Sequence, residues 1–290
     1  MKKFTYSILI PSFNGLTLLK KHLPTIIKHS QRVDAIMIVD DGSTDGTVEF
    51  LKKEYPKVKV LHNRNNFGFP KSVNLGVRNV TTDLFVLLNN DVSVTNGYLE
   101  SAIKRFDNPK VFAVTLNETT SSWPQVSWSE KLQYVRGEEK DRAHYSAWAS
   151  GGSAIFRKSI WDNLSGFDEV YSPGYWEDID IGWRAWKAGY TIIWEPDAKV
   201  IHEHESSFNK FDKNYLNLIK QRNELVFNWK NITDPVMRRE HLHYLLRHSL
   251  THPGYLKVII AAINKLPTQV KNEEKLTDRQ ILAMVNQPFS

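Results

Sequence analysis

Acidic and amide side chains follow short apolar runs at two points in the first third of the chain. Asp40 and Asp41 come directly after the run 35–39, and Asn89-Asn90-Asp91 follows the run 84–88. A carboxylate at such a position can anchor Mg²⁺ or Mn²⁺ together with phosphate oxygens and water. It can also accept a hydrogen bond from the imino N–H of a nucleobase. Because Asn and Asp are common in plain turns as well, each motif alone leaves both interpretations open.

A second group of carboxylates opens a predicted helix over 177–188. Glu177, Asp178 and Asp180 fall in its first turn, where the helix dipole favours acidic side chains. Asp180 lies four residues before Arg184, the spacing of an ordinary surface ion pair. A single carboxylate within hydrogen-bond reach of a hydroxyl can remove its proton. The residues alone therefore leave Asp178 open between a helix-start acid and a catalytic base.

Strands and helices alternate over the first 115 residues, and these elements must position the polar groups. Alternation of this kind predicts an α/β fold with a wound, mostly parallel sheet and helices on both faces. Ligands of such sheets bind beyond the carboxyl ends of the strands. The apolar runs typical of strands buried on both faces occupy 6–10, 35–39, 58–61, 84–88 and 111–114. Helical patterns occupy 16–29, 45–54, 70–79 and 96–106.

The pattern of apolar and polar residues changes twice in the second half of the chain. Residues 116–147 show no clear period and are interpreted as an excursion over the surface. After residue 206 the pattern is helical to the end, with interruptions at prolines. We therefore divide the chain into a unit over 1–205 and a basic helical region over 206–290. Between them we expect a strand near 149–156, the helix over 177–188, and paired strands near 190–194 and 199–202.

Composition excludes several classes of protein. The chain has 290 residues, of which 41% are hydrophobic and 24% are charged, so it is neither disordered nor fibrous. It has no cysteine, which excludes disulfides, thiolate zinc clusters and a cysteine nucleophile. The apolar stretch 8–10 ends at Pro11, too early for a signal peptide. The longest apolar run, 258–263, is far shorter than the ~20 residues that cross a bilayer. We expect a cytoplasmic protein.

The net charge of +6 is concentrated in the last third of the chain. Residues 206–290 hold 13 Lys and Arg against 7 Asp and Glu, whereas the two signs balance in residues 1–205. A basic, apolar and helical region could lie on anionic lipid headgroups at the inner face of the cell membrane. It could equally be a packing region or the interface of a homodimer, since an amphipathic stripe is the normal sign of burial.

Several motifs together resemble the family 2 glycosyltransferases, which have the GT-A fold. The Asn-Asn-Asp form is similar to the rhamnosyltransferase-like bacterial branch, although the fuller family motif has a second acid where this chain has Asn89 or Asn90. The motifs are Ser7-Ile-Leu-Ile-Pro-Ser-Phe-Asn14, Val39-Asp-Asp-Gly-Ser-Thr-Asp45, Asn66-Phe-Gly68, Asn74-Leu-Gly76, Leu87-Leu-Asn-Asn-Asp91, Gly151-Gly152, Gly166-Phe-Asp-Glu169, Glu177-Asp-Ile-Asp180 and His202.

The resemblance implies a role for each matching residue. Asp91 and His202 would hold Mg²⁺ or Mn²⁺, with His204 a bystander, and Asp178 would be the catalytic base. Lys71 would reach the phosphates of the donor. The remaining donor nucleotide contacts would come from Pro11, Ser12, Phe13, Asn14, Asp40, Asp41, Asn90 and Asp91. The sugar acceptor would contact Trp176, Glu177 and Gly152.

Tryptophans are concentrated between residues 123 and 194. Trp183 and Trp186 have helical spacing and are expected in the core. Trp123, Trp128 and Trp176, in predicted loops, are candidates for stacking on a sugar ring, because indole has an apolar face and a polar edge.

The function predicted from these residues is an inverting, metal-dependent transfer of a sugar. The donor would be dTDP-rhamnose or a UDP-sugar, and the acceptor a hydroxyl of a surface polysaccharide or lipid-linked glycan. Inversion follows if the base and the leaving diphosphate lie on opposite faces of the sugar. One alternative is a sugar-1-phosphate nucleotidyltransferase, which would need a Gly- and Arg-rich phosphate loop that residues 11–15 do not provide. Another is a nucleic-acid-binding protein that uses the basic region, with affinity that falls steeply with salt.

Overall fold

The computed structural model describes residues 4–30, 33–118, 123–138, 141–203, 212–266 and 274–289. Its strands are β1 (Tyr6–Ser12), β2 (Ala35–Asp40), β3 (Lys59–His62), β4 (Leu84–Leu88), β5 (Val92–Val94), β6 (Val111–Glu118), β7 (Pro124–Trp128), β8 (Leu132–Arg136), β9 (His144–Tyr145), β10 (Ser153–Arg157) and β11 (Thr191–His202). Its α-helices are α1 (Leu16–His29), α2 (Thr47–Glu54), α3 (Phe69–Arg78), α4 (Glu100–Lys104), α5 (Lys158–Asn163), α6 (Glu177–Lys187), α7 (Lys213–Asn231), α8 (Pro235–Thr251), α9 (Leu256–Ile263) and α10 (Asp278–Met284).

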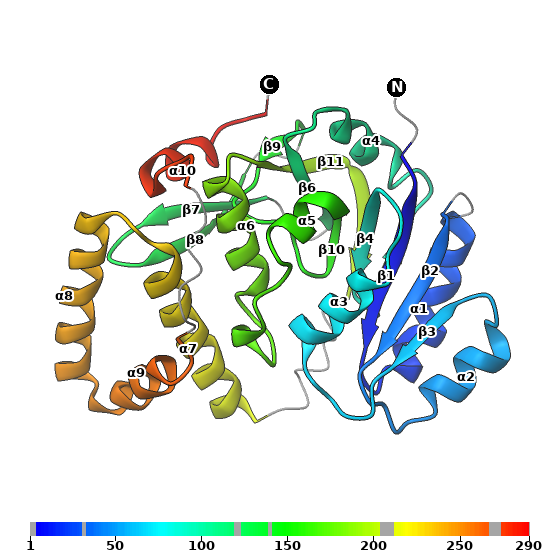
Figure 1. Ribbon diagram of the computed structural model, residues 1–290, viewed down its shortest axis with the longest axis horizontal. Coiled ribbons are helices and arrows are strands. Elements are labelled where there is room, and N and C mark those ends of the chain that lie inside the picture. The colour runs from blue at the N-terminus through cyan, green and yellow to red at the C-terminus, as the bar shows by residue number, and fades with distance from the viewer. Residues whose placement is uncertain are drawn as a thin grey trace.

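A nine-stranded sheet runs through the described part of the molecule. Its strand order is β3-β2-β1-β4-β10-β6-β11-β5, with β9 paired to β11. β1 is parallel to β2 and β4, β2 is parallel to β3, and β11 is parallel to β6. β10 is antiparallel to both of its neighbours. This mixed, mostly parallel sheet with covering helices confirms the predicted fold class (Figure 1).

Helices cover both faces of the sheet because successive strand residues face opposite sides. Leu9 of β1 belongs to one buried cluster with Val73 of α3, and this cluster also takes in residues of α5 and α6. Its neighbour Ile8 belongs to a second cluster with Leu23 of α1, which takes in residues of α2 and α4. The central strands are therefore apolar on both faces, which is why their sequences are continuous apolar runs.

The predicted surface excursion over 116–147 is wrong. β6 continues to Glu118, and β7 pairs with β8 in a two-stranded hairpin. Val126 and Leu132 of this hairpin are buried in the same cluster as the first face of the main sheet. The two strands are only five residues long, and several of their residues are polar. Their alternation is too short to stand out from a loop.

The predicted strands near 190–194 and 199–202 are one strand, β11. Its pairing with β6 shifts register between Glu195 and Lys199, as expected of a β-bulge. Pro196 falls inside this irregular segment and has no N–H to offer a ladder. The strand bends there and still delivers His202 to the sheet edge, opposite Val92 of β5.

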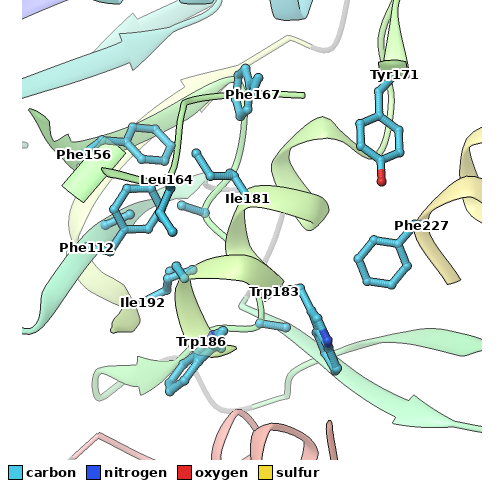
Figure 2. Packing of buried hydrophobic residues seen from close by; sticks show 14 of the residues in the cluster. Phe112, Phe156, Leu164, Phe167, Tyr171, Ile181, Trp183, Trp186, Ile192 and Phe227 are labelled. Atoms are coloured by element: carbon cyan, nitrogen blue, oxygen red, sulfur yellow. The ribbon is translucent and has the colours of Figure 1, made fainter. Parts of the chain in front are cut away.

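The helix α7 shares its core with the first 205 residues. Phe227 of α7 lies 6.0 Å from Trp183 of α6 between ring centroids, and Figure 2 shows Phe227 beside both Trp183 and Tyr171. Trp183 and Trp186 are buried, as predicted. Figure 1 shows α7, α8 and α9 together at the left end of the molecule. The division of the chain at residue 205 stays a prediction.

Asp180 is fully buried and joins α6 to α7. Its carboxylate accepts hydrogen bonds from Arg184 and Lys230 at 2.7 Å, from Asn231 at 2.8 Å and from the hydroxyl of Tyr171 at 2.9 Å. Burial alone would raise the pKa of Asp180, but Arg184 and Lys230 outweigh it and hold the pKa far below its usual range. The predicted ion pair with Arg184 therefore exists, but inside the protein rather than on its surface.

Asp180→Asn should lower the free energy of unfolding by about 3–5 kcal/mol, because it removes the buried carboxylate that pairs with Arg184 and leaves Lys230 with Asp168 as its anion. Urea denaturation followed by circular dichroism measures this loss. Asp162→Asn is the matched control, since Asp162 pairs with Lys158 four residues away but its side chain is 53% exposed. This control should cost less than about 1 kcal/mol. Equal losses for the two variants would contradict the structural role of Asp180.

Candidate active site

A cavity of about 610 Å³ opens beyond the carboxyl ends of β1 and β4. It is of the size that small-molecule sites in proteins commonly have. Most of the predicted site residues line it, although they come from segments up to about 190 positions apart in the sequence. They are Pro11, Ser12, Phe13, Asp41, Asn90, Asp91, Gly152, Trp176, Glu177, Asp178 and His202.

The turn after β1 is fixed by side chains from two other strand ends. The amide of Asn90 donates to the hydroxyl of Ser12 at 3.0 Å. Asn14 adopts a left-handed backbone with φ of 47°, and its side-chain oxygen accepts from the backbone N–H of Thr44 at 2.8 Å. A Cβ on Gly15 would lie 2.3 Å from the Asn90 side chain, so only glycine fits there. Asn14 does not line the cavity; it ties two of the strand-end loops together.

The two neighbouring acids after β2 have different surroundings. Asp41 lines the cavity, and its carboxylate accepts from the backbone N–H of Gly68 at 2.8 Å and of Phe67 at 3.1 Å. Asp40 is fully buried behind it and contacts His62 at 2.8 Å. Asp41 therefore both faces the cavity and shapes the loop before α3, whereas Asp40 does not line the cavity.

Asp91 and His202 meet at the edge of the cavity. The Nε2 atom of His202 lies 3.0 Å from Oδ1 of Asp91, and its Nδ1 atom lies 2.9 Å from Oε1 of Glu118. Burial alone would lower the pKa of His202, but hydrogen bonding to Asp91 and Glu118 outweighs it and raises the pKa to about 9. Glu118 also accepts from the hydroxyl of Ser153 at 2.6 Å. Sequence reasoning missed Glu118, because it fell in the segment interpreted as a surface excursion.

The carboxylate of Asp91 is suited to holding a hard cation. Both of its oxygens are buried, and among the described residues their close polar contact is with the Nε2 atom of His202. No group of three or more His, Cys, Asp or Glu with metal-site geometry occurs in the described ranges. The donor set of Asp91 and His202 fits Mg²⁺ or Mn²⁺ once Nε2 of His202 has lost its proton, because a ligating imidazole must be neutral. The ion would take its remaining ligands from phosphates and water. His204 lies outside the described residues.

Asp178 and Glu177 also line the cavity, and they begin α6. The carboxylate of Asp178 accepts from the backbone N–H of Gly151 at 3.2 Å and of Ile179 at 2.9 Å. Burial raises the pKa of both acids, and the charge of Asp178 raises that of Glu177 further, to well above its ordinary value. Oε2 of Glu177 is buried with no hydrogen-bond partner in the described residues. The charged form is therefore disfavoured more strongly at Glu177 than at Asp178, which has two N–H donors to support it.

The turn before α6 is strained and is held from α7. Tyr175 and Trp176 have φ of 71° and 79°, a left-handed backbone that only glycine adopts without cost. Asn223 of α7 is fully buried, and its amide donates to the carbonyls of Tyr171, Gly174 and Tyr175 at 2.8–2.9 Å. Asn223 carries no local sequence signal for this role, because it lies nearly 50 positions beyond the turn.

The two lysines near the cavity are placed differently from the prediction. Lys71, predicted to reach the phosphates, does not line the cavity; its ammonium group is half exposed, 4.0 Å from Glu169. Lys220 of α7 does line it, with its ammonium group 4.5 Å from the ring centroid of Tyr175. Sequence reasoning did not find Lys220.

Of the three tryptophans proposed for sugar stacking, Trp176 lines the cavity and the other two do not. Trp123 is buried and stacks on His144, with 3.8 Å between ring centroids. Trp128 lies on β7 and donates to Glu240 at 2.8 Å. Trp128 was placed in a loop in error, since the hairpin of β7 and β8 was not predicted, whereas Trp123 directly precedes β7 and lies in no strand. Trp148, which does line the cavity, was not among the candidates.

Comparison with known proteins agrees with this geometry. The model of glycosyl transferase family 2 matches residues 7–164, and the chain belongs to this family. An N-acetylglucosaminyl-diphospho-decaprenol L-rhamnosyltransferase of Mycobacterium tuberculosis is 24% identical over 235 residues, which cover 68% of this chain and 76% of the relative. The O-antigen chain rhamnosyltransferase RfbN of Salmonella typhimurium is 22% identical over 210 residues, covering 68% of this chain and 66% of the relative.

Solved structures share the fold at low identity. A mannosyltransferase of Pyrobaculum calidifontis in complex with GDP-Man and Mn²⁺ aligns with a TM-score of 0.58 and 18% identity, covering 91% of this chain and 75% of its own. GalNAc-T7 with UDP, GalNAc and Mn²⁺ aligns with a TM-score of 0.68 and 14% identity, covering 98% of this chain and 58% of its own. The fold is thus that of the GT-A glycosyltransferases.

The chain is accordingly a glycosyltransferase that uses nucleotide-sugar donors. Family membership decides against both the nucleotidyltransferase and the nucleic-acid-binding alternatives.

Asn223→Leu should lower kcat for sugar transfer by about tenfold or more, because small displacements of a positioned catalytic group are costly. The variant fills nearly the same volume but no longer donates to the carbonyls of the strained turn. Steady-state rates and donor titrations separate kcat from donor binding, which we expect to change little. Asn286→Leu is the control: Asn286 donates to Val126 at 2.8 Å and does not line the cavity. Equal loss of activity in both variants would point to general destabilisation.

Proposed function

We propose that this glycosyltransferase inverts the anomeric centre, requires Mg²⁺ or Mn²⁺, and transfers a sugar to a hydroxyl of a surface-polysaccharide or lipid-linked glycan. The donor would be dTDP-rhamnose or a UDP-sugar, and the site of action the cytoplasmic face of the membrane. One observation carries the proposal: the carboxylates of Asp91, which follows β4, and Asp178, which begins α6, line the same cavity. The rhamnosyl donor is favoured by the names of two of the relatives.

The wall formed by the strand ends has the chemistry to hold the donor. Pro11, Ser12, Phe13, Asp41 and Asn90 line the part of the cavity next to β1 and β4 and would contact the nucleotide. Asn14 and Asp40 would act through the loops that they fix. A divalent cation held by Asp91 and His202 would neutralise charge on the diphosphate when it is bound. The proposed phosphate contact of Lys71 stays a prediction, and Lys220 is the lysine that lines the cavity.

The residues at the start of α6 have the chemistry to activate the acceptor. Asp178, ionised and hydrogen-bonded to the N–H of Gly151, would accept the proton of the acceptor hydroxyl. Glu177, kept neutral by burial and by its neighbour, would donate a hydrogen bond to the acceptor instead of competing for the proton. Trp176 and Gly152 would complete the acceptor site. If the hydroxyl attacks the face of the sugar away from the departing diphosphate, its oxygen–carbon bond forms as the carbon–phosphate-oxygen bond breaks, and this single displacement inverts the anomeric centre.

Asp178→Asn should reduce the rate of transfer by about 10²–10⁴-fold, the usual contribution of a general base. Nucleotide binding, measured by isothermal titration calorimetry, should stay unchanged. NMR of the wild-type product should show an inverted anomeric configuration. A retained configuration would overturn the role of Asp178 as base. Asp162→Asn, whose carboxylate is exposed away from the cavity, should be fully active.

The same base sets the acid limb of the pH profile. Activity needs the ionised form of Asp178, and burial raises the pKa of this group. Activity should therefore rise with pH. The pH of half-maximal activity should lie above about 4, which is the pKa of an ordinary aspartate.

Nucleotide diphosphates should stabilise the protein in a metal-dependent way. We expect one base, uracil or thymine, to raise Tm with Mg²⁺ or Mn²⁺ present and to raise it much less with a chelator, because a ligand stabilises the state that binds it. Asp91→Asn should remove the metal-dependent part of the shift while Asp162→Asn keeps it. A panel of nucleotides in a thermal-shift assay measures this without relying on turnover. Equal shifts with and without metal would rule out a metal held by Asp91.

A further inference from the structure

The helix α8 has an apolar stripe on its exposed side. Leu242, Leu246 and Leu250 recur every four residues and are 56%, 58% and 85% exposed. On the opposite side of the helix, Met237 and Leu245 are buried against the protein. The helix is therefore apolar on two sides, and packing within the described chain uses only one of them. An amphipathic core helix needs only the buried side.

Cations flank this stripe. With 3.6 residues per turn, Arg238 and Arg247 lie roughly 80° and 100° from Leu246 on opposite sides of the helix, and Arg239 lies within the stripe. All three are exposed. The acidic residue of the helix, Glu240, lies further round and accepts a hydrogen bond from Trp128. Arg247 pairs with Glu130 of the β7–β8 hairpin, which leaves Arg238 and Arg239 as the cations nearest the leucines.

The next helix repeats the pattern. On α9, Leu256, Ile260 and Ile263 are about half exposed and share one side of the helix, while Val258 and Ala262 are buried. Lys257 is exposed beside this second stripe. A short 3₁₀ turn at 253–255 joins the two helices, and Figure 1 shows them meeting at one corner of the molecule. Leu250 and Leu256 bring the two stripes to this corner.

Charge decides what kind of partner fits. Residues 236–266 contain five Lys and Arg and a single acidic residue, so this segment holds most of the net charge of the chain. A second copy docked on the same face would bring these cations against each other, because a twofold interface pairs a surface with itself. Leucines and isoleucines flanked by cations instead match an anionic lipid surface, in which the apolar side chains enter the acyl region and the cations meet the headgroups.

We propose that the exposed faces of α8 and α9 dock on an anionic lipid bilayer and lie in its interface. No helix in the described ranges is long and apolar enough to cross a membrane. The contact is therefore peripheral and reversible, and Leu246, Leu250 and Ile260 are its central apolar side chains. Lipid binding of this kind needs no donor, metal or acceptor, so it stands apart from the sugar-transfer chemistry.

Flotation of the full chain with vesicles tests the proposal. The protein should float with vesicles of phosphatidylcholine and phosphatidylglycerol and stay at the bottom with phosphatidylcholine alone. The triple variant Leu246→Ser, Leu250→Ser, Ile260→Ser should bind anionic vesicles about tenfold or more weakly, since it removes buried apolar area. The control variant, Val135→Ser with Leu218→Ser, changes two exposed apolar residues on β8 and α7 and should float as the wild type does. Circular dichroism confirms that each variant is folded.

A charge variant tests the headgroup contact separately. Arg239→Gln with Lys257→Gln should weaken flotation with anionic vesicles and reduce its dependence on salt, because fewer charges are screened. Equal flotation with neutral and anionic vesicles would overturn the proposal, as would no flotation at all. Size-exclusion chromatography completes the test. A wild-type dimer that the triple variant converts to a monomer, without vesicle binding, would assign the surface to a second copy of the chain. Vesicle binding is the readout of this test, so a variant that loses transferase activity but still floats does not count against the proposal.

Discussion

The arrangement depends on keeping the negative charge of Asp91 at the inner edge of the cavity, almost out of reach of water. The ends of three strands must converge for this: β4, which precedes Asp91, β11, which delivers His202, and β6, which supplies Glu118. Two carboxylates share one imidazole there, so His202 carries a positive charge that partly balances them. A buried charge without such partners would destabilise the fold. The bulge in β11 and the antiparallel strand β10, which lies between β4 and β6, are part of the arrangement that brings these strand ends together.

The helix α7 is the second constraint, and it acts on the start of α6. Its residues Asn223 and Lys230 hold the strained turn and the buried Asp180 on either side of Asp178. The left-handed backbone at Tyr175 and Trp176 persists only because these contacts are strong enough to offset its cost. The helical C-terminal region is thus part of the machinery that orients the proposed base, even though the matched family segment ends at residue 164.

Sequence was a good guide wherever the signal was local. The continuous apolar runs of the central strands and the polar residues directly after them were sufficient to place Ser12, Asp41 and Asp91 at one sheet edge. Short half-buried strands carry a weaker pattern, and the β7–β8 hairpin was therefore predicted as a loop. Glu118, Lys220 and Asn223 act through contacts with residues far away in the sequence. Their own neighbourhoods give no sign of those contacts, and only folding brings them to the cavity.

The different environments of the acidic residues explain how one cavity can serve both the leaving diphosphate and the attacking hydroxyl of a displacement reaction. Asp91 lies among strand ends in contact with His202. Burial and the neighbouring carboxylate raise the pKa of Glu177, whose Oε2 has no hydrogen-bond partner in the described residues, whereas Asp178 accepts two backbone N–H groups that support its charge. A leaving diphosphate and an attacking hydroxyl make opposite demands, one for positive charge and the other for a proton acceptor. Assigning these demands to different residues, Asp91 after β4 and Asp178 at the start of α6, lets each carboxylate have the surroundings that its proposed role needs.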